Sequence, residues 1–291
     1  MGLSFGTFEL LKHQKRKILP AKDGGRKALM FGRAKMSLSD EQRALVSQRD
    51  GISLELLSGW ADRFLIDYGY DWIGSLDYSS FEGAEFTWNL NKPLMGDVGA
   101  LSVQLGSMDL VLDYGTSEHV FCPSTSLWNA TKFLRLGGIL NAVLPIAGWC
   151  DHGMYQFSPS FFYAIDRSDL RLESLYFYCA DNQTTNLICW DGLSAEFRQH
   201  VHGAFDGSFA ANCLQYLNKP ILAFALFRKE RDLEYSDFVY STQQSIYAVQ
   251  WEKSLKFVES DQEKLRLYNL READHGRELA RHVRSFSVQL S

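Results

Sequence analysis

Short apolar runs that alternate with helical segments constrain the fold of this chain most strongly. Seven runs have the length and composition of buried strands: 27–33, 72–79, 85–91, 108–115, 139–145, 172–179 and 220–227. The segments between several of these runs have apolar residues at helical spacing. Strands that alternate with helices are typical of a mainly parallel sheet with helices on both faces. The sequence therefore predicts a Rossmann-like α/β domain with a mostly parallel seven-stranded sheet.

Three helices are expected inside this domain. Ser37 or Ser39 can cap the first, because a hydroxyl precedes the acidic residues of SLSDEQ, and acidic side chains favour a helix N-terminus. A second helix is expected over 54–68, where apolar residues recur at helical spacing. A third is expected over 127–134, and the segment PSFFYAI also has helical character.

The chain divides into a central domain and two additions. We assign residues 27–229 to one Rossmann-like domain and residues 1–26 to a helix, a basic run and a linker. The basic run could contact phosphate or acidic lipid, or it could be a solvated helix end. Residues 230–291 form a polar, helical C-terminal extension, which could pack on the domain or join two subunits in a homodimer.

The overall charge argues against nucleic acid as a partner. A formal net charge of -5 and a pI of about 5.8 provide no general field that attracts a polyanion or an anionic membrane. The N-terminal apolar stretch is too short and mixed for a signal peptide, and no later segment is long enough and apolar enough to span a bilayer. We expect a cytoplasmic protein whose partner is a small-molecule substrate.

The sequence lacks the motifs that mark several common classes of enzyme. The chain has no G-x-S-x-G, P-loop or H-E-x-x-H motif, which are the marks of many hydrolases, nucleotide triphosphatases and zinc proteases. Its five cysteines are widely spaced, without a C-x-x-C pair or a His/Cys spacing that indicates zinc. We therefore expect reduced thiols and no metal.

Two segments resemble the class I S-adenosylmethionine-dependent methyltransferases. They are DLVLDYGTSEHV (109–120) and WNATKFLRLGGILNAVLP (128–145). In that family an acidic residue ends the fourth strand, a Glu-His pair often follows, and a helix leads through a leucine-rich stretch with glycines to the fifth strand. The resemblance implies a Rossmann-like methyltransferase fold and S-adenosyl-L-methionine as cofactor.

A narrower resemblance lies in HGMYQFSPSFFYAI (152–165). It looks like the HGFYQFSP segment of a bacterial group of methyltransferase-like proteins that is sometimes linked to surface-polysaccharide genes. In that group the segment SLDYSSFEGAEFTWNLNKPL (75–94) also has a counterpart. Together the matches cover about 200 residues of the central domain.

The first strand departs from the family pattern. Most members close this strand with E/D-x-G-x-G-x-G, because side chains there would block close backbone approach to the cofactor. This chain has Phe31-Gly32-Arg33-Ala34-Lys35 instead, with one glycine and two cations. Gly32 remains a cofactor-binding candidate. Arg33 could hold an anionic substrate group, or it could be surface charge.

Four further residues are candidates for cofactor binding. The resemblance places Asp77 where an acid accepts hydrogen bonds from the ribose diol, and Tyr78 where a ring lies against adenine. Asn89 falls near the position that recognises the adenine amino group, and Asp113 lies at the open end of the fourth strand. Turn or helix capping is the alternative for both aspartates, and simply ending a strand is the alternative for Asn89.

Acceptor-side chemistry is assigned to two segments. His119 could accept a proton from a hydroxyl or amine, because the pKa of histidine is near neutrality, and Glu118 could orient it or cap the next helix. His152 and Gln156 are substrate-binding candidates in a loop after the fifth strand, and Tyr155 is a catalytic one. A structural role remains the alternative for these side chains.

Two functions follow from these observations. The first is methyl transfer to a hydroxyl or amine of a small molecule, such as a sugar or another biosynthetic intermediate. The second is a methyltransferase-like protein that has lost methyl transfer because of its altered glycine loop. Such a protein would act as a binding or scaffold subunit, or would catalyse different chemistry in the same cleft.

Overall fold

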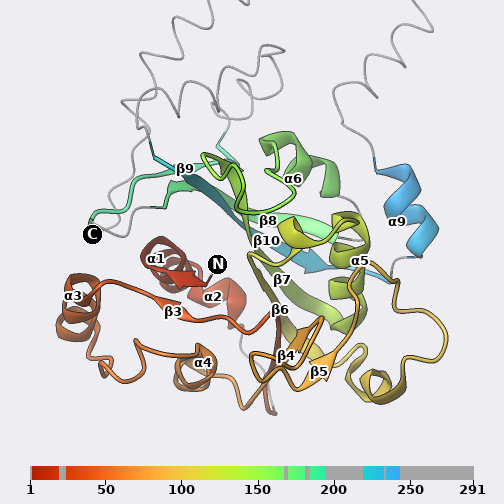
Figure 1. The fold of residues 1–291 in the computed structure, drawn as a ribbon, viewed down its shortest axis with the longest axis horizontal. Coiled ribbons are helices and arrows are strands. Elements are labelled where there is room, and N and C mark those ends of the chain that lie inside the picture. The colour runs from red at the N-terminus through yellow and green to blue at the C-terminus, as the bar shows by residue number, and fades with distance from the viewer. Residues whose placement is uncertain are drawn as a thin grey trace, which may run out of the picture.

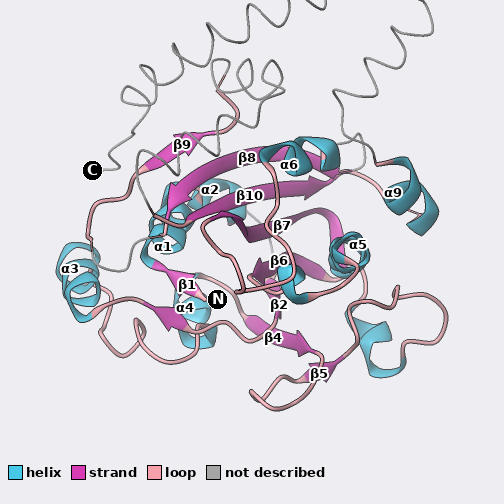
Figure 2. Ribbon diagram, turned by 45° about the horizontal axis from the view of Figure 1, so that its top comes forward, coloured by secondary structure: helices cyan, strands magenta, loops and turns pink. Residues whose placement is uncertain are grey.

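A single large sheet forms the centre of the molecule in the computed structural model, which describes residues 2–19, 24–166, 170–180, 184–194, 219–232 and 234–242 (Figures 1 and 2). Its strands are β2 (Lys27–Phe31), β4 (Trp72–Asp77), β5 (Phe86–Thr87), β6 (Met108–Tyr114), β7 (Leu134–Ala147), β8 (Leu170–Cys179), β9 (Cys189–Asp191) and β10 (Ile221–Lys229). Their order across the sheet is β5-β4-β2-β6-β7-β10-β8-β9.

Most of the sheet is parallel. The pairs β5–β4, β4–β2, β2–β6 and β6–β7 are all parallel, whereas β10 runs antiparallel to both β7 and β8. The predicted Rossmann-like α/β class is confirmed. The described part of the sheet has eight strands where seven were expected, because the short strand β9 adds to its edge, antiparallel to β8.

Helices cover both faces of the sheet (Figure 2). One layer contains α1 (Phe5–His13), α2 (Lys15–Ile18), α3 (Asp40–Asp50) and α4 (Asp62–Tyr68); the other contains α5 (Pro123–Phe133), α6 (Pro159–Ile165) and α9 (Tyr235–Ser241). Short elements complete the list: β1 (Leu3–Ser4), β3 (Met36–Ser37), and the 3-10 helices η1 (Gly99–Gln104) and η2 (Ser117–His119).

The two cores follow from the alternation of side chains along the strands. In β2, Ala28 and Met30 pack in the core under the N-terminal helices, whereas Leu29 and Phe31 pack under α5 and α6. All four are essentially fully buried. A strand buried on both faces needs a continuous apolar run, and this requirement explains why 27–33 was recognisable from sequence.

Helix α3 begins as predicted. Ser39 accepts a hydrogen bond from the Gln42 backbone, and the Gln42 side chain accepts one from the Ser39 backbone, so the two residues form a capping box. The helix ends at Gly51, which has the left-handed conformation that favours glycine.

The helix expected over 54–68 is shorter than predicted. It begins only at Asp62. The chain just before it is tied to the segment after β2, because Met36 donates to the Gly59 carbonyl and Ala61 donates to the Ala34 carbonyl. Backbone groups used in these contacts cannot also form helical hydrogen bonds, so tertiary pairing overrides helical periodicity here.

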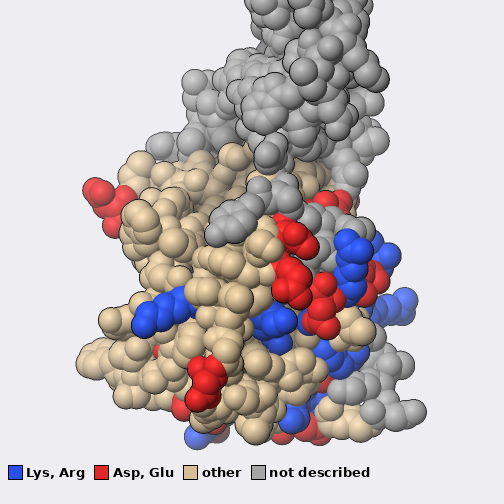
Figure 3. Space-filling model, turned by 90° about the vertical axis from the view of Figure 1, so that its right-hand side faces the viewer, with Lys and Arg blue, Asp and Glu red and all other residues tan. Residues whose placement is uncertain are grey.

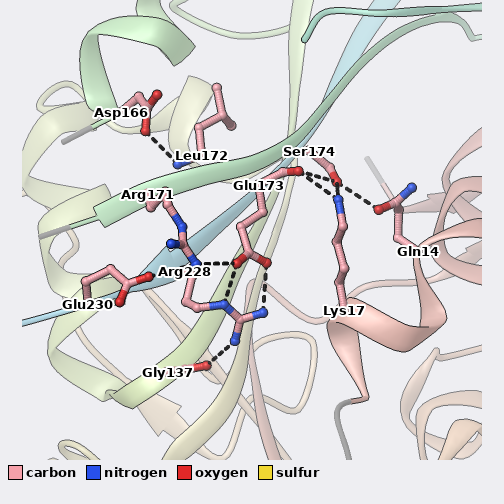
Figure 4. Close-up of polar contacts among 10 residues, drawn as sticks. All are labelled: Gln14, Lys17, Gly137, Asp166, Arg171, Leu172, Glu173, Ser174, Arg228 and Glu230. Atoms are coloured by element: carbon pink, nitrogen blue, oxygen red, sulfur yellow. Dashed lines mark hydrogen bonds and ion pairs between the residues drawn. The ribbon is translucent and has the colours of Figure 1, made fainter. Parts of the chain in front are cut away.

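The N-terminal segment is part of the domain's packing. Phe8 and Leu10 of α1 are fully buried in the core shared with β2. Beyond this helix, the Lys17 ammonium donates to the Glu173 carbonyl and to the Ser174 hydroxyl of β8 (Figure 4). The basic run therefore contacts the sheet through Lys17.

Acidic and basic side chains lie next to one another on the face that Figure 3 shows.

None of the helices in the described ranges is long and apolar enough to cross a membrane. Most of the C-terminal extension, including the segment proposed to join two subunits, lies outside the described residues.

Candidate functional site

A cavity of about 230 Å³ opens at the carboxyl ends of β2, β4 and β6. Ligands of open α/β sheets bind at this edge, at the point where the strand order reverses. Here β2 is the reversal point, since the chain continues to β4 on one side and to β6 on the other. The cavity is lined by Phe31, Gly32, Arg33, Ala34, Asp77, Glu82, Tyr114, Gly115, Thr116 and His119.

Four of the residues singled out from sequence meet at this cavity: Gly32, Arg33, Asp77 and His119. They come from three segments far apart in the chain. The register of the parallel strands brings them together, because Phe31 pairs with Leu76 of β4 and with Asp113 of β6. The structure thus assembles a cleft in which β2, β4 and β6 each contribute a residue at their carboxyl end.

Gly32 occupies a position that only glycine fits without strain. Its φ of +67° is left-handed, and a Cβ there would lie 2.7 Å from the Thr116 hydroxyl oxygen. That hydroxyl donates a 2.6 Å hydrogen bond to the Phe31 carbonyl, so it is held in place. The altered loop keeps its one glycine where β2 and β6 approach most closely, and the backbone remains open to the cavity.

Asp77 lines the cavity from the end of β4. One carboxylate oxygen accepts a hydrogen bond from the Tyr78 backbone at 2.6 Å, as a turn aspartate does. Tyr78 is 76% exposed and does not line the cavity. The predicted contacts of Asp77 with ribose and of Tyr78 with adenine remain predictions.

Arg33 and Lys35 are engaged with their surroundings. The Arg33 guanidinium lies over the Trp60 ring at 4.8 Å, is 3.3 Å from the Asp62 carboxylate and donates to the Glu82 carbonyl. The Lys35 ammonium lies over the same ring and 3.5 Å from the Glu82 carboxylate. Arg33 lines the cavity, whereas Lys35 only contacts the lining residue Glu82. The anion-binding role predicted for Arg33 remains a prediction.

Asp113 fastens the loop behind the cavity. Its carboxylate accepts hydrogen bonds from the Thr116 and Ser117 backbones, at 3.0 and 3.2 Å, and from the Ser117 hydroxyl. Asp113 is fully buried and does not line the cavity; burial raises its pKa, while these hydrogen bonds act in the opposite direction. Asp113 thus binds the chain at the start of η2, and its predicted contact with the cofactor remains a prediction.

Asn89 lies outside the main cavity. Its side-chain oxygen accepts two hydrogen bonds from Asn91, one from the backbone and one from the carboxamide. A second cavity, of about 460 Å³, lies beside it, lined by Glu85 to Trp88 and Asp97 to Leu101. The contact predicted between Asn89 and adenine remains a prediction.

Glu118 and His119 both face His152. The Glu118 carboxylate lies 3.8 Å from Nε2 of His119, and the His119 and His152 rings are 5.3 Å apart. Glu118 is fully buried, whereas the His119 side chain is 44% exposed and His152 is exposed. We call these three residues the Glu-His-His cluster.

Burial controls the charges of the cluster. Burial, and secondarily the negative charge of Asp113, raise the pKa of Glu118 to about 8. Burial lowers the pKa of His119, with a smaller contribution from His152, and also lowers that of His152. Among the residues that the structure describes, neither carboxylate oxygen of Glu118 has a hydrogen-bond partner.

The loop after β7 is tied to η2 at several points. Met154 and Tyr155 donate backbone hydrogen bonds to the Glu118 carbonyl, and the Tyr155 hydroxyl donates to the Phe121 carbonyl at 2.7 Å. The Gln156 side chain accepts from the Trp149 backbone. Tyr155 and Gln156 therefore stabilise the loop that carries His152, and their predicted roles toward substrate remain predictions.

Sequence reasoning missed Thr116, Glu82 and the convergence of His152 on Glu118. Thr116 stands between Asp113 and the Glu-His pair, so its position after a strand-ending acid was a usable signal for a strand-end loop. Glu82 and His152 offered no such signal, because their places depend on how two loops fold back over the sheet.

Comparison with known proteins gives matches only in overall structure. No protein-family model and no curated protein matches this chain. Among similar solved structures, a putative methyltransferase from Bacillus halodurans has 11% identity and a TM-score of 0.41, covering 75% of this chain and 98% of that one. The YcgJ protein from Bacillus subtilis has 12% identity and a TM-score of 0.40, covering 77% and 98%.

A further similar structure is phosphoethanolamine N-methyltransferase 1 from Haemonchus contortus, in complex with phosphoethanolamine and S-adenosylhomocysteine. It has 14% identity and a TM-score of 0.38, covering 88% of this chain and 52% of that one. Likenesses of this size carry no argument about activity. The functional proposal therefore depends on the chain's own residues.

Proposed function

We propose that this chain is an S-adenosylmethionine-dependent methyltransferase that acts on a hydroxyl or amine of a small molecule. One observation carries the proposal: the cavity at the carboxyl ends of β2, β4 and β6, with Gly32 and Asp77 on its wall. This is the ligand edge of an open α/β sheet, and in nucleotide-binding folds of this kind an acid after the second strand binds ribose.

The residues present fit the nucleoside part of such a cofactor. Gly32 leaves the backbone open, because it has no side chain to block the cavity and could not carry one without meeting Thr116. Asp77 has a second carboxylate oxygen that accepts no hydrogen bond from any residue the structure describes, so it could accept one from a ribose hydroxyl. When bound, the cofactor would supply an electrophilic methyl group on a positively charged sulfur.

The acceptor would enter at the His119 end of the cavity. The cofactor, held by Gly32 and Asp77, would supply the methyl group that the acceptor's lone pair takes, and the electron pair of its carbon–sulfur bond would stay on sulfur. The proton released by the acceptor leaves at the same end, where the Glu-His-His cluster lies. Alignment of nucleophile and methyl group supplies much of the rate in such a step.

The cavity's size bears on the second candidate function, a binding or scaffold protein without methyl transfer. At about 230 Å³, it is smaller than the roughly 300–1,000 Å³ of typical small-molecule pockets. Arg33, which lines the cavity, lies over the Trp60 ring, and so does Lys35. Purified protein that already contains S-adenosylhomocysteine would count against this candidate.

Calorimetric titration with S-adenosylhomocysteine tests the proposal. We expect one molecule bound per chain, and binding at least about tenfold weaker in Asp77→Ala, since hydrogen bonds to charged groups contribute about 1.5–3 kcal/mol. Asp97→Ala is a matched control, because Asp97 is also a turn aspartate, accepting from the Gly99 backbone, but lies outside this cavity. No heat of binding at millimolar ligand would rule the proposal out.

A further inference from the structure

Glu118 is a buried carboxyl group without a hydrogen-bond partner in the described part of the chain, and this is an unusual state for a polar side chain. Its exposed fraction is 0%, and among the described residues no donor contacts either carboxylate oxygen. An unsatisfied buried polar group destabilises a fold, so a native fold that keeps one calls for an explanation such as an ion. Ligand atoms of Glu118, His119 and His152 all lie within 4.8 Å of one another.

We propose that Glu118, His119 and His152 bind a divalent first-row transition-metal ion of the zinc type, with a coordination position open to solvent and to the cavity. The binding of the ion does not depend on methyl transfer. Its use to hold and polarise an acceptor hydroxyl or amine rests on the proposed function.

The donor set matches this class of ion. Two imidazole nitrogens and one carboxylate form the protein ligands of many catalytic zinc sites, which leave the fourth position for water or substrate. Magnesium and calcium prefer sites made of oxygen ligands alone. The partial exposure of His119 and His152 leaves an approach to the ion from solvent, while Glu118 supplies a ligand from the protein interior.

The distances among the three ligand atoms are compatible with a bound ion after a small movement of the side chains toward one another. For three atoms at most 4.8 Å apart there is a point within about 2.8 Å of each, and zinc bonds to nitrogen and oxygen are about 2.0–2.2 Å. Each ligand atom therefore has to move by less than about 1 Å, which exposed imidazoles can do by small rotations of their side chains.

The loop that carries His152 is held against Glu118. A Cβ at Gly153 would lie 2.8 Å from Cγ of Glu118, so glycine is what allows this loop to pack so closely. The Glu118 carbonyl accepts hydrogen bonds from the same loop, and the His152 ring lies 5.0 Å from that of Trp149. His152 is thus brought to Glu118 by packing and by backbone hydrogen bonds.

Backbone strain marks the same loop. Asp151 has a φ of +63°, and it is the only residue other than glycine with a positive φ in the part of the chain described. Strain of this kind is kept where the surrounding structure imposes it, and it clusters at functional sites. Its place directly before His152 fits a loop shaped to present that imidazole.

The opposite side of the cluster is equally fixed. Asp113 binds the backbone at both Thr116 and Ser117, and the Ser117 hydroxyl also contacts that of Ser126 on α5 at 2.8 Å. Residues that hold metal ligands in place commonly change metal affinity by 10–100-fold when mutated. Asp113 and Ser117 are therefore positioning residues for Glu118 and His119.

Titration of chelator-treated, dialysed full-length protein with zinc chloride tests the site. We expect one high-affinity ion per chain, and at least about tenfold weaker binding in His152→Ala and in Glu118→Gln. His13→Ala is the matched control, because His13 is an exposed histidine on the N-terminal helix, and it should bind zinc like the wild type. Magnesium chloride should give no comparable binding.

The variants also guard against misfolding and adventitious binding. His152 is exposed, so its replacement should leave the fold intact, and Glu118→Gln retains the volume of a buried side chain. Cys150→Ser removes an exposed thiol beside the loop and should retain the zinc affinity. Wild-type affinity in both His152→Ala and Glu118→Gln, or no stoichiometric zinc in the wild type, would overturn the proposal. Failure to bind S-adenosylhomocysteine would not affect it.

Discussion

Glu173 and Glu118 are both largely buried, and their surroundings are opposite. Glu173 on β8 is 13% exposed and accepts hydrogen bonds from Arg228 at 2.5 and 2.7 Å and from Arg171 at 3.0 Å (Figure 4). Glu118 in η2 is 0% exposed and has no hydrogen-bond partner among the described residues. The first carboxylate is paired within the chain, and the second is left available.

The difference separates a region built for stability from one built for a ligand. Arg228 also donates to the Gly137 carbonyl at 2.7 Å, so the Glu173 network joins β7, β10 and β8. Glu118 joins no strands through its side chain and faces two partly exposed imidazoles instead. A buried acid that the fold does not use for its own stability is a good candidate for binding something else.

Removal of the Glu173 charge should have the largest effect. Glu173→Gln leaves the largely buried Arg228 without its carboxylate, and breaking a buried pair in this way costs about 3 kcal/mol. Urea titration should show this loss in the free energy of unfolding. Glu118→Gln is the matched exchange. It should leave the free energy of unfolding unchanged or raise it, because Glu118 has no hydrogen bond to lose among the described residues. An equal loss of stability in both variants would contradict the difference between the two glutamates.

Acid should weaken the same network. Burial by itself would raise the pKa of Glu173, but its hydrogen bonds and ion pairs with Arg228 and Arg171 outweigh burial and lower it. A lowered folded-state pKa gives stability that is present above the unfolded value of about 4.3 and is lost as pH falls through the folded value. The stability difference between wild type and Glu173→Gln should therefore shrink below about pH 4.3. A difference that grows on acidification would contradict the sign.

The cleft should be sensitive at Gly32. Gly32→Ala should cost about 2 kcal/mol, since a left-handed conformation costs about 1–2 kcal/mol for a residue with a Cβ and the new atom would also meet Thr116. Gly51→Ala is the control, with a φ of +69° and nothing within 4 Å of the new atom, and should cost only about 1 kcal/mol. In a Thr116→Ala background the two costs should become similar; a persistent excess at Gly32 would show that Thr116 is not its cause.

Relief of strain beside His152 should have the smallest effect. Asp151→Gly removes the cost of a positive φ but adds the entropy of glycine to the unfolded chain, so stability should rise by less than about 1 kcal/mol. We expect zinc affinity to fall in the same variant, because the loop is less well held. Lower stability together with unchanged zinc affinity would argue against a strained, preorganised loop.

The fold was largely predictable because its strands are buried on both faces. The continuous apolar runs at β2, β6 and β10 indicated buried strands, and Ser39 marked the start of α3. The late start of α4 was not predictable, because its cause is pairing between residues 59–61 and 34–36. The edge strand β9 is only three residues long, too short for a periodic signal.

The site was predictable only in part. Gly32, Asp77 and His119 were identified from the resemblance to a family motif, and they lie together because the strand ends of a parallel sheet meet at one edge. The Glu-His-His cluster was not, because it depends on a loop after β7 that folds back onto η2 through Gly153. The sequence had indicated no metal, since ligands contributed by distant loops leave no characteristic spacing.

Diffraction from crystals soaked with zinc chloride and S-adenosylhomocysteine, recorded at the zinc absorption edge, tests the account most directly. We predict an anomalous peak bounded by Glu118, His119 and His152, and nucleoside density in the cavity with its ribose hydroxyls at Asp77. Without the peak, Glu118 would be an unpaired acid with no ion to explain it, and the metal site would be refuted. A cavity that stays closed to the nucleoside would contradict the proposed methyl transfer.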